Sequence, residues 1–315
     1  MVTLPATVET STARRATARR AAVIAALSVV LTALVYLVAV RTEAGQQFEN
    51  RVWLGAGQTA SQRPAQAVGA LNLIGTWSVV AAVLVVLGIG LARRQVALAL
   101  AGVALIAASI GTTEFLKDTL PRPNLVPGWT DSAGNSFPSG HTTVAMSVMF
   151  ALILVAPYRF RGLIAFCTAA TATEIGALTI VARWHRPSDT LGADLVVLCY
   201  ASLAVLVLAA AGRIRPVPPR PAGARTPRGL LTLGPIALGT AAAACGAVLY
   251  AALTYYHRVH YAPGWETSAS AFYTGCLIAL AGSGVATLAL LWLLARLDLA
   301  APGSDPAPQE GPEMA

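Results

Sequence analysis

The chain has 315 residues, of which 56% are hydrophobic and only 11% are charged, and its formal net charge is +8. A soluble domain carries roughly a quarter charged residues, so this composition excludes an ordinary soluble domain and is typical of a membrane protein. The basic residues are spread over short loops, which argues against nucleic acid as a partner and favours contact with anionic membrane lipids.

Long apolar runs predict an all-α fold, a bundle of helices that cross the membrane. The first run is too long for the apolar part of a signal peptide and is followed by no clear cleavage site, so we expect a retained anchor. Residues 41–70 read as a polar loop. The predicted spans are residues 21–40, 72–92, 95–116, 141–157, 162–182, 190–212, 230–254 and 271–295.

A basic, Pro-rich segment divides the predicted spans into a core of six and a C-terminal pair. The predicted parts are a disordered cytoplasmic tail at 1–20, a six-span core at 21–212, a linker at 213–229, two further spans at 230–296 and a disordered tail at 297–315. Arg residues concentrate in alternate loops, which favours cytoplasmic N- and C-termini. All four His then fall on the outer face, and the strong Arg bias suggests a bacterial inner membrane.

Lys117 stands out because it is the only Lys among 22 basic residues. It ends the third span, and Arg122 follows in a loop rich in Pro, Gly and Asn. Lys offers phosphate a point charge and Arg a bidentate fork, so the two suit an anion. Alternatively, Lys117 snorkels from the end of a span and Arg122 caps a turn.

Pro138-Ser139-Gly140-His141 opens the fourth span. Ser is a preferred N-cap, and Gly leaves backbone amides open to close approach. The free amides and the positive end of the helix dipole form an anion site, beside which an imidazole can donate a proton. The alternative is a plain helix cap after a Pro turn.

His185 and Asp189 are four residues apart at the start of the sixth span, so they share a helical face. Asp189 can then hold one ring nitrogen of His185 and raise the basicity of the other, as in a catalytic triad. The alternative is a helix cap with an interfacial His. The four Cys lie in apolar runs without metal-ligand spacing, and we predict no metal site and no cofactor.

These motifs resemble the type 2 phosphatidic acid phosphatase family, which is related to vanadium haloperoxidases. The resemblance covers about residues 70–212, with motifs at 117–189. The second motif is complete as Pro138-Ser139-Gly140-His141, and the end of the third is intact as His185-Arg186-Pro187-Ser188-Asp189.

Two departures from the family pattern concern Arg residues. The family usually has six residues between Lys and Arg-Pro, whereas four separate Lys117 from Arg122, and Asn124 occupies the usual Arg position. The family also has Arg six residues before His, where this chain has Thr179. Arg183 and Arg186 are the candidates for the missing charge.

The resemblance implies a metal-independent phosphatase that acts through a phosphohistidine. His185 would attack phosphorus, Asp189 would orient His185, and His141 would protonate the leaving group. The phosphoryl oxygens would be held by Lys117, Arg122, Arg183 and the amides near Ser139 and Gly140. A site at the membrane surface favours a lipid phosphate as substrate.

Three functions share these residues. The first is hydrolysis of a lipid phosphomonoester or pyrophosphate, and the second is phosphotransfer to another acceptor. The third is binding or transport of a lipid phosphate without turnover, which Thr179 motivates and the intact His141, His185 and Asp189 oppose. The sequence does not identify the lipid, a protein partner, the oligomeric state or the role of the C-terminal spans.

Overall fold

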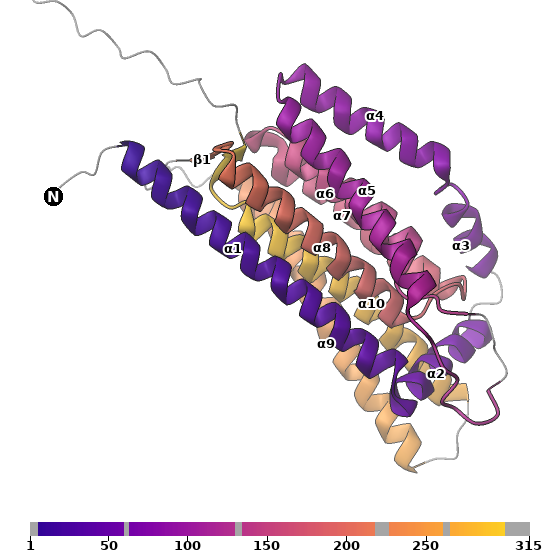
Figure 1. The fold of residues 1–315 in the computed structure, drawn as a ribbon. Helices are drawn as coiled ribbons and strands as arrows, with labels where there is room; N and C mark the ends of the chain where they lie inside the picture. The colour runs from indigo at the N-terminus through magenta and orange to yellow at the C-terminus, as the bar shows by residue number, and fades with distance from the viewer. Residues whose placement is uncertain (1–5, 60–62, 130–133, 218–226, 261–264, 300–315) are drawn as a thin grey trace, which may run out of the picture.

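A computed structural model describes residues 6–59, 63–129, 134–217, 227–260 and 265–299. These residues form a bundle of long helices with one two-stranded ladder at its end (Figure 1). The helices are α1 Ala6–Val35, which continues as a π-helical turn at Tyr36–Val40, α2 Glu43–Thr59, α3 Arg63–Leu71, α4 Thr76–Ala92, α5 Val96–Thr119, α6 Gly140–Val155, α7 Tyr158–Val181, α8 Pro187–Ala210, α9 Pro227–His260 and α10 Trp265–Leu293; the strands are β1 Ile214–Pro216 and β2 Leu297–Leu299.

Every predicted span corresponds to a helix, but the structure has six to seven candidate membrane spans rather than eight. Six helices are long and apolar enough alone, and α3 with α4 forms a seventh that is bent by 52°. The predicted span that is missing from this count is α6. Its 16 residues extend over only about 24 Å, which is less than the roughly 30 Å thickness of a bilayer core.

Helix α6 is short because it lies inside the protein rather than against lipid. It packs against α5, α7 and α8, and Met146, Phe150 and Leu154 along its length are completely buried. A helix that is apolar on all sides is expected in such an interior position. Its first residue therefore has a fixed place among the surrounding helices.

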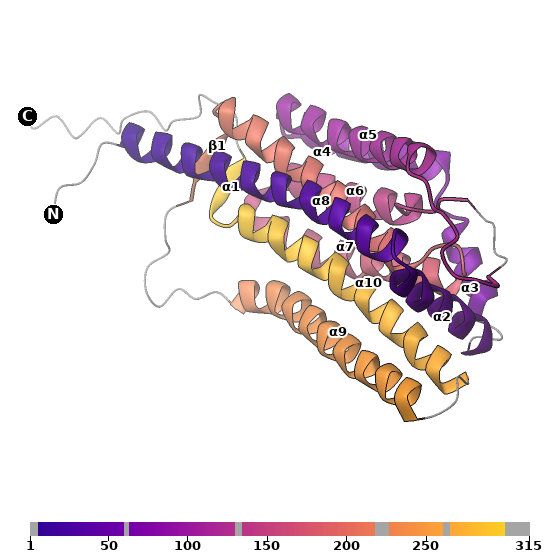
Figure 2. The ribbon, with the colours of Figure 1, turned by 60° about the horizontal axis from the view of Figure 1, so that its bottom comes forward.

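Helix α10 belongs to the same bundle, because it packs against α2, α7 and α8. The hydroxyl of Ser283 on α10 donates to the buried carboxylate of Asp194 on α8, 2.9 Å away. Helix α9 lies outside and packs on α10 and α7 (Figure 2). The division into a six-span core and two further spans remains a prediction.

The prediction of a disordered tail at residues 1–20 is wrong from residue 6 onward, because α1 begins at Ala6. Arg14 donates to the carbonyl of Ile214 in β1, and Thr17 and Ala21 are buried, so tertiary contacts stabilise the Ala-rich helix. The predicted tail at 297–315 likewise begins with β2, which pairs antiparallel with β1. The rest of that tail, 300–315, and most of the linker, 218–226, lie outside the described residues.

The predicted polar loop at 41–70 is also wrong, since it forms α2 and α3. Helix α2 lies across the end of the bundle where α5 and α7 end and α6 and α8 begin (Figure 1). It packs against α10, and a Cβ at Gly55 would lie 2.0 Å from the carbonyl oxygen of Ser268. This close contact fixes α2 over the predicted site.

Candidate active site

Ser139 caps the first turn of α6, as the sequence predicts. Its hydroxyl oxygen accepts hydrogen bonds from the Thr142 amide at 3.3 Å and from the Thr142 hydroxyl at 3.0 Å. The side chain is completely buried, so it is committed to the helix and not to a ligand. Ser139 thereby organises the amides at the start of this helix, which are the predicted anion-binding feature.

The segment before α6 is fastened to α8. The Ser139 amide donates to the carbonyl of Asp189 at 2.8 Å, and the Ser136 hydroxyl donates to Oδ2 of Asp189 at 2.7 Å. Phe137 is completely buried and lies so close to Gly192 that a Cβ there would be 2.5 Å from the ring. The second and third motifs therefore form one rigid unit.

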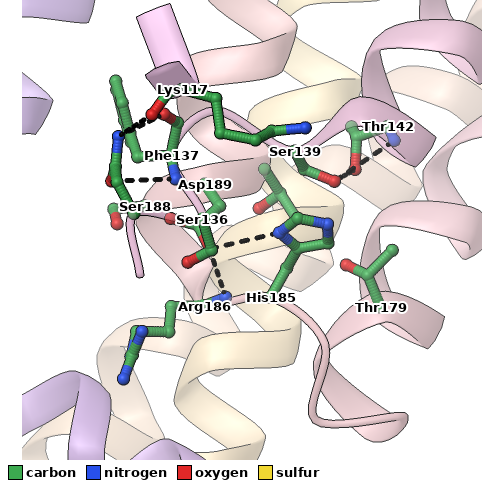
Figure 3. A network of polar contacts seen from close by, with 12 residues as sticks. Lys117, Ser136, Phe137, Ser139, Thr142, Thr179, His185, Arg186, Ser188 and Asp189 are labelled. Carbon is green, nitrogen blue, oxygen red and sulfur yellow. Dashed lines mark hydrogen bonds and ion pairs between the residues drawn. The ribbon is translucent and has the colours of Figure 1, made fainter. Parts of the chain in front are cut away.

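His185 is oriented by Asp189, as predicted. Nδ1 of His185 lies 3.3 Å from Oδ2 of Asp189, which also accepts from the Arg186 amide at 2.8 Å. Figure 3 shows these contacts converging on the carboxylate. Because Asp189 is completely buried and occupies Nδ1, the Nε2 atom is the nitrogen available for chemistry.

His141 and His185 share a cavity of about 280 Å³. Their ring centroids are 6.3 Å apart, and the ring of His141 also packs 5.2 Å from that of Trp184. Both rings therefore face the same small space. The cavity is lined by Ile74, Ile110, Thr113, Glu114, Lys117, Gly140, His141, Thr143, Val144 and His185.

Lys117 lies beside the start of α6, as predicted. Its ammonium is 2.8 Å from Oε1 of Glu114, and a Cβ at Gly140 would lie 3.5 Å from Nζ and 3.2 Å from the same Glu114 oxygen. Because Gly140 has no side chain, the Lys117 ammonium can lie close to the amides at the start of α6. Glu114 balances the charge of Lys117.

Arg122 lies behind the cavity rather than in its lining. Nη1 is 3.5 Å from Oδ1 of Asp189, and Nη2 forms a short ion pair with Oε2 of Glu49. Asn124, at the usual family position for this Arg, instead holds its own loop through the carbonyl of Trp129. The shorter spacing after Lys117 thus directs Arg122 to two carboxylates.

Glu49 is a site residue that the sequence reading missed. It is buried on α2, and its Oε1 accepts from the Ser188 amide at 3.2 Å. Burial raises the pKa of Glu49, although the nearby Arg122 acts in the opposite direction. No motif marks Glu49, because it pairs with a residue 73 positions later.

Arg183 and Arg186, the two candidates for the charge missing at Thr179, do not line the cavity. The Arg183 guanidinium stacks on Trp53 of α2, with Cζ 3.2 Å from the ring centroid. The Arg186 side chain points away from the His185 ring (Figure 3). The Thr179 carbonyl accepts from the amides of Trp184 and His185, which turns the chain back towards the cavity at the end of α7.

In the part of the chain that the structure describes, no group of three or more His, Cys, Asp or Glu is placed to hold a metal ion. The arrangement is an oriented imidazole, a second imidazole and one ammonium around a helix start. Such a set can perform nucleophilic and acid–base chemistry on an anion.

Comparison with known proteins gives one family match. Residues 96–215 match the family model described as the PAP2 superfamily. The match runs from α5 into β1 and includes Lys117, His141 and His185. Glu49 lies outside it. No curated protein and no solved structure matches the chain significantly.

Proposed function

Residues 96–215 of this integral membrane protein are a PAP2 superfamily domain, and from that premise we propose that the protein is a lipid phosphate phosphatase acting through a phosphohistidine. The observation that carries the proposal is the placement of His141 and His185 on one cavity, with Asp189 behind His185. A binding protein has no need of an oriented base beside a second imidazole.

In the first step, Nε2 of His185 attacks phosphorus and forms the N–P bond. The ester P–O bond breaks, and its electron pair stays on the leaving oxygen, which takes a proton from His141. Lys117 and the amides at the start of α6 stabilise the charge on the phosphoryl oxygens. Such positioning and charge stabilisation account for most of the catalysis in phosphoryl transfer.

In the second step, water attacks the phosphohistidine. His141, now neutral, accepts the proton of the water, the N–P bond breaks, and its electron pair returns to Nε2 of His185. The products are an alcohol and inorganic phosphate. If an alcohol replaced the water, the same site would transfer the phosphoryl group instead.

A lipid substrate is supported by an apolar groove next to the cavity. The groove has a volume of about 290 Å³ and shares Ile74 and Val144 with the cavity. It runs between α4, α6 and α7 and is lined mainly by apolar side chains, so a hydrocarbon chain would lie in it while the phosphate lies between the histidines. The lining is Ile74, Ser78, Ala82, Val144, Ala145, Val148, Met149, Leu152, Cys167, Thr168, Thr171, Ala172 and Ile175.

We further propose that the cavity opens on the outer face of a bacterial inner membrane. The charge bias of the sequence supports this orientation. The described parts of both chain ends lie at the opposite end of the bundle, where Arg14 contacts β1 and Arg161 contacts β2. A reporter fused after Arg296 should behave as cytoplasmic, and a periplasmic signal would reverse the orientation.

The enzymatic proposal is tested by phosphate release from a panel of lipid phosphates and pyrophosphates. The purified protein in detergent should release phosphate in the presence of EDTA, whereas His185→Ala should be inactive with an unchanged melting temperature. Transfer to an added alcohol without free phosphate would identify a phosphotransferase. Binding without turnover of any member of the panel would identify a lipid-phosphate binding protein.

A further inference from the structure

We propose that Glu49, on a helix outside the family domain, is a positioning residue that sets the basicity of His185 through Arg122 and Asp189. The inference rests on the proposed role of His185 as the attacking group. It assigns to α2 a part in the chemistry that no motif of the sequence marks.

The contacts form a chain of three charged side chains behind the cavity. Glu49 pairs with Arg122, Arg122 reaches Asp189 at 3.5 Å, and Asp189 holds Nδ1 of His185. The side chains of Arg122, Glu49 and Asp189 are 8%, 2% and 0% exposed, so solvent hardly screens them. Charge effects are correspondingly stronger here than at a surface.

The sign of each charge decides what Glu49 does. Asp189 places a negative charge beside Nδ1 of His185, and a negative charge there stabilises the imidazolium form of a histidine over the neutral form. Arg122 opposes Asp189, and its guanidinium cannot lose its proton. The carboxylate of Glu49 neutralises Arg122, so the cluster of three keeps the net charge of Asp189 alone.

Glu49 also fixes the backbone that carries Asp189. Its Oε1 accepts from the Ser188 amide, which belongs to the unpaired first turn of α8, and an acidic side chain is favourable there. Helix α2 is itself held by the close contact of Gly55 with α10. The site is therefore completed by α2 and α10, which the family domain does not include.

Other charged or titratable groups around His185 stay unchanged when Glu49 is replaced. These are Glu114 and Lys117 on α5, His141 on α6, and Arg183 and Arg186 beside His185. Helix α7 presents Thr179, and the described side chains of α10 at 268–293 include no charged group. A change in His185 on replacing Glu49 therefore reports on the chain through Arg122.

The test is the pKa of His185, measured by NMR on the full chain labelled at its four histidines, with the signal assigned by its loss in His185→Ala. Glu49→Gln keeps the shape and the acceptor for Ser188 but removes one negative charge. We expect it to lower the pKa of His185 by roughly half a unit or more. The double variant Glu49→Gln/Arg122→Gln removes one charge of each sign and should restore the wild-type value.

An unchanged pKa of His185 in Glu49→Gln would overturn the inference. A pKa of His185 that is as low in the double variant as in Glu49→Gln would overturn it too. If Glu49→Gln does not fold, Arg122→Gln gives the opposite sign: loss of the cation should raise the pKa of His185, and an unchanged or lowered value would contradict the assignment. In the phosphatase assay, Glu49→Gln should lower kcat about tenfold with little change in KM. Because the NMR result needs no turnover, it stands apart from the outcome of the phosphatase assay.

Discussion

Nδ1 of His185 lies 3.3 Å from Oδ2 of Asp189, and that oxygen also accepts hydrogen bonds from Ser136 and the Arg186 amide. The carboxylate is thus held by the loop before α6 and by the turn before α8. Its position fixes the His185 ring relative to the start of α6. One buried carboxylate therefore organises both histidine motifs.

Asp189→Asn should lower kcat by roughly a thousandfold or more, because an amide can present its NH₂ group to Nδ1 and select the wrong tautomer. KM should change little, since Asp189 does not line the cavity. Steady-state kinetics on a water-soluble phosphomonoester measures both constants. A loss confined to KM would assign Asp189 to substrate binding instead.

The positions of His141, His185 and Asp189 could be predicted because each lies in a short motif whose spacing fixes its geometry. Four residues on a helix put His185 and Asp189 on one face, and Ser139 is a strong N-cap signal. The positions of Arg122 and Arg183 could not be predicted. Each depends on a partner on α2, Glu49 or Trp53, and pairing across such separations leaves no periodic signal in the sequence.

His141→Ala should affect substrates according to their leaving groups. A general acid contributes about 10² to 10⁴ in rate, so the loss should be of that order for an alkyl phosphate. For p-nitrophenyl phosphate, whose leaving group needs no proton, it should be far smaller. The ratio of kcat/KM between the two substrates, compared in the wild type and the variant, measures this dependence on the leaving group. Equal losses of kcat/KM for both substrates would argue against His141 as the acid.

Thr171→Trp should block the groove between α4, α6 and α7, where Thr171 is an exposed part of the lining. Excluding even two methylene groups costs about 1.6 kcal/mol, so kcat/KM for a long-chain lipid phosphate should fall on the order of tenfold. A short water-soluble phosphate should be unaffected.

The matched control for Thr171→Trp is Val207→Trp, at a position that is 63% exposed on α8 and outside the groove lining. This variant should leave both substrates unchanged. If Thr171→Trp lowers kcat/KM equally for long and short substrates, the groove is not the site of the hydrocarbon chain.

Gly192→Ala should destabilise the protein, because its Cβ would lie 2.5 Å from the buried ring of Phe137. Overpacking of this kind costs about 1–3 kcal/mol, and here it would push the loop before α6 away from α8. Gly111→Ala on α5 is the control, since a Cβ there meets nothing within 4 Å. Melting temperatures in detergent compare the two, and equal values would contradict the close packing of Phe137.

The helical fold was predictable from long apolar runs, which leave few alternatives in a membrane. Helix α2 was not, because its polar residues resemble a loop, and its helical state depends on packing against α10. Similarly, the start of α1 and the β1–β2 ladder depend on contacts between the two ends of the chain. Such tertiary contacts override the local composition on which a sequence-based prediction rests.

The most direct test of the central claim is to trap the covalent intermediate. Protein quenched during turnover of radiolabelled p-nitrophenyl phosphate, whose leaving group needs no proton, should carry an acid-labile, base-stable phosphate that mass spectrometry places on His185. His141→Ala is used to slow hydrolysis of this intermediate. A phosphate on another residue, or turnover that persists in His185→Ala with no trapped phosphate, would contradict the account.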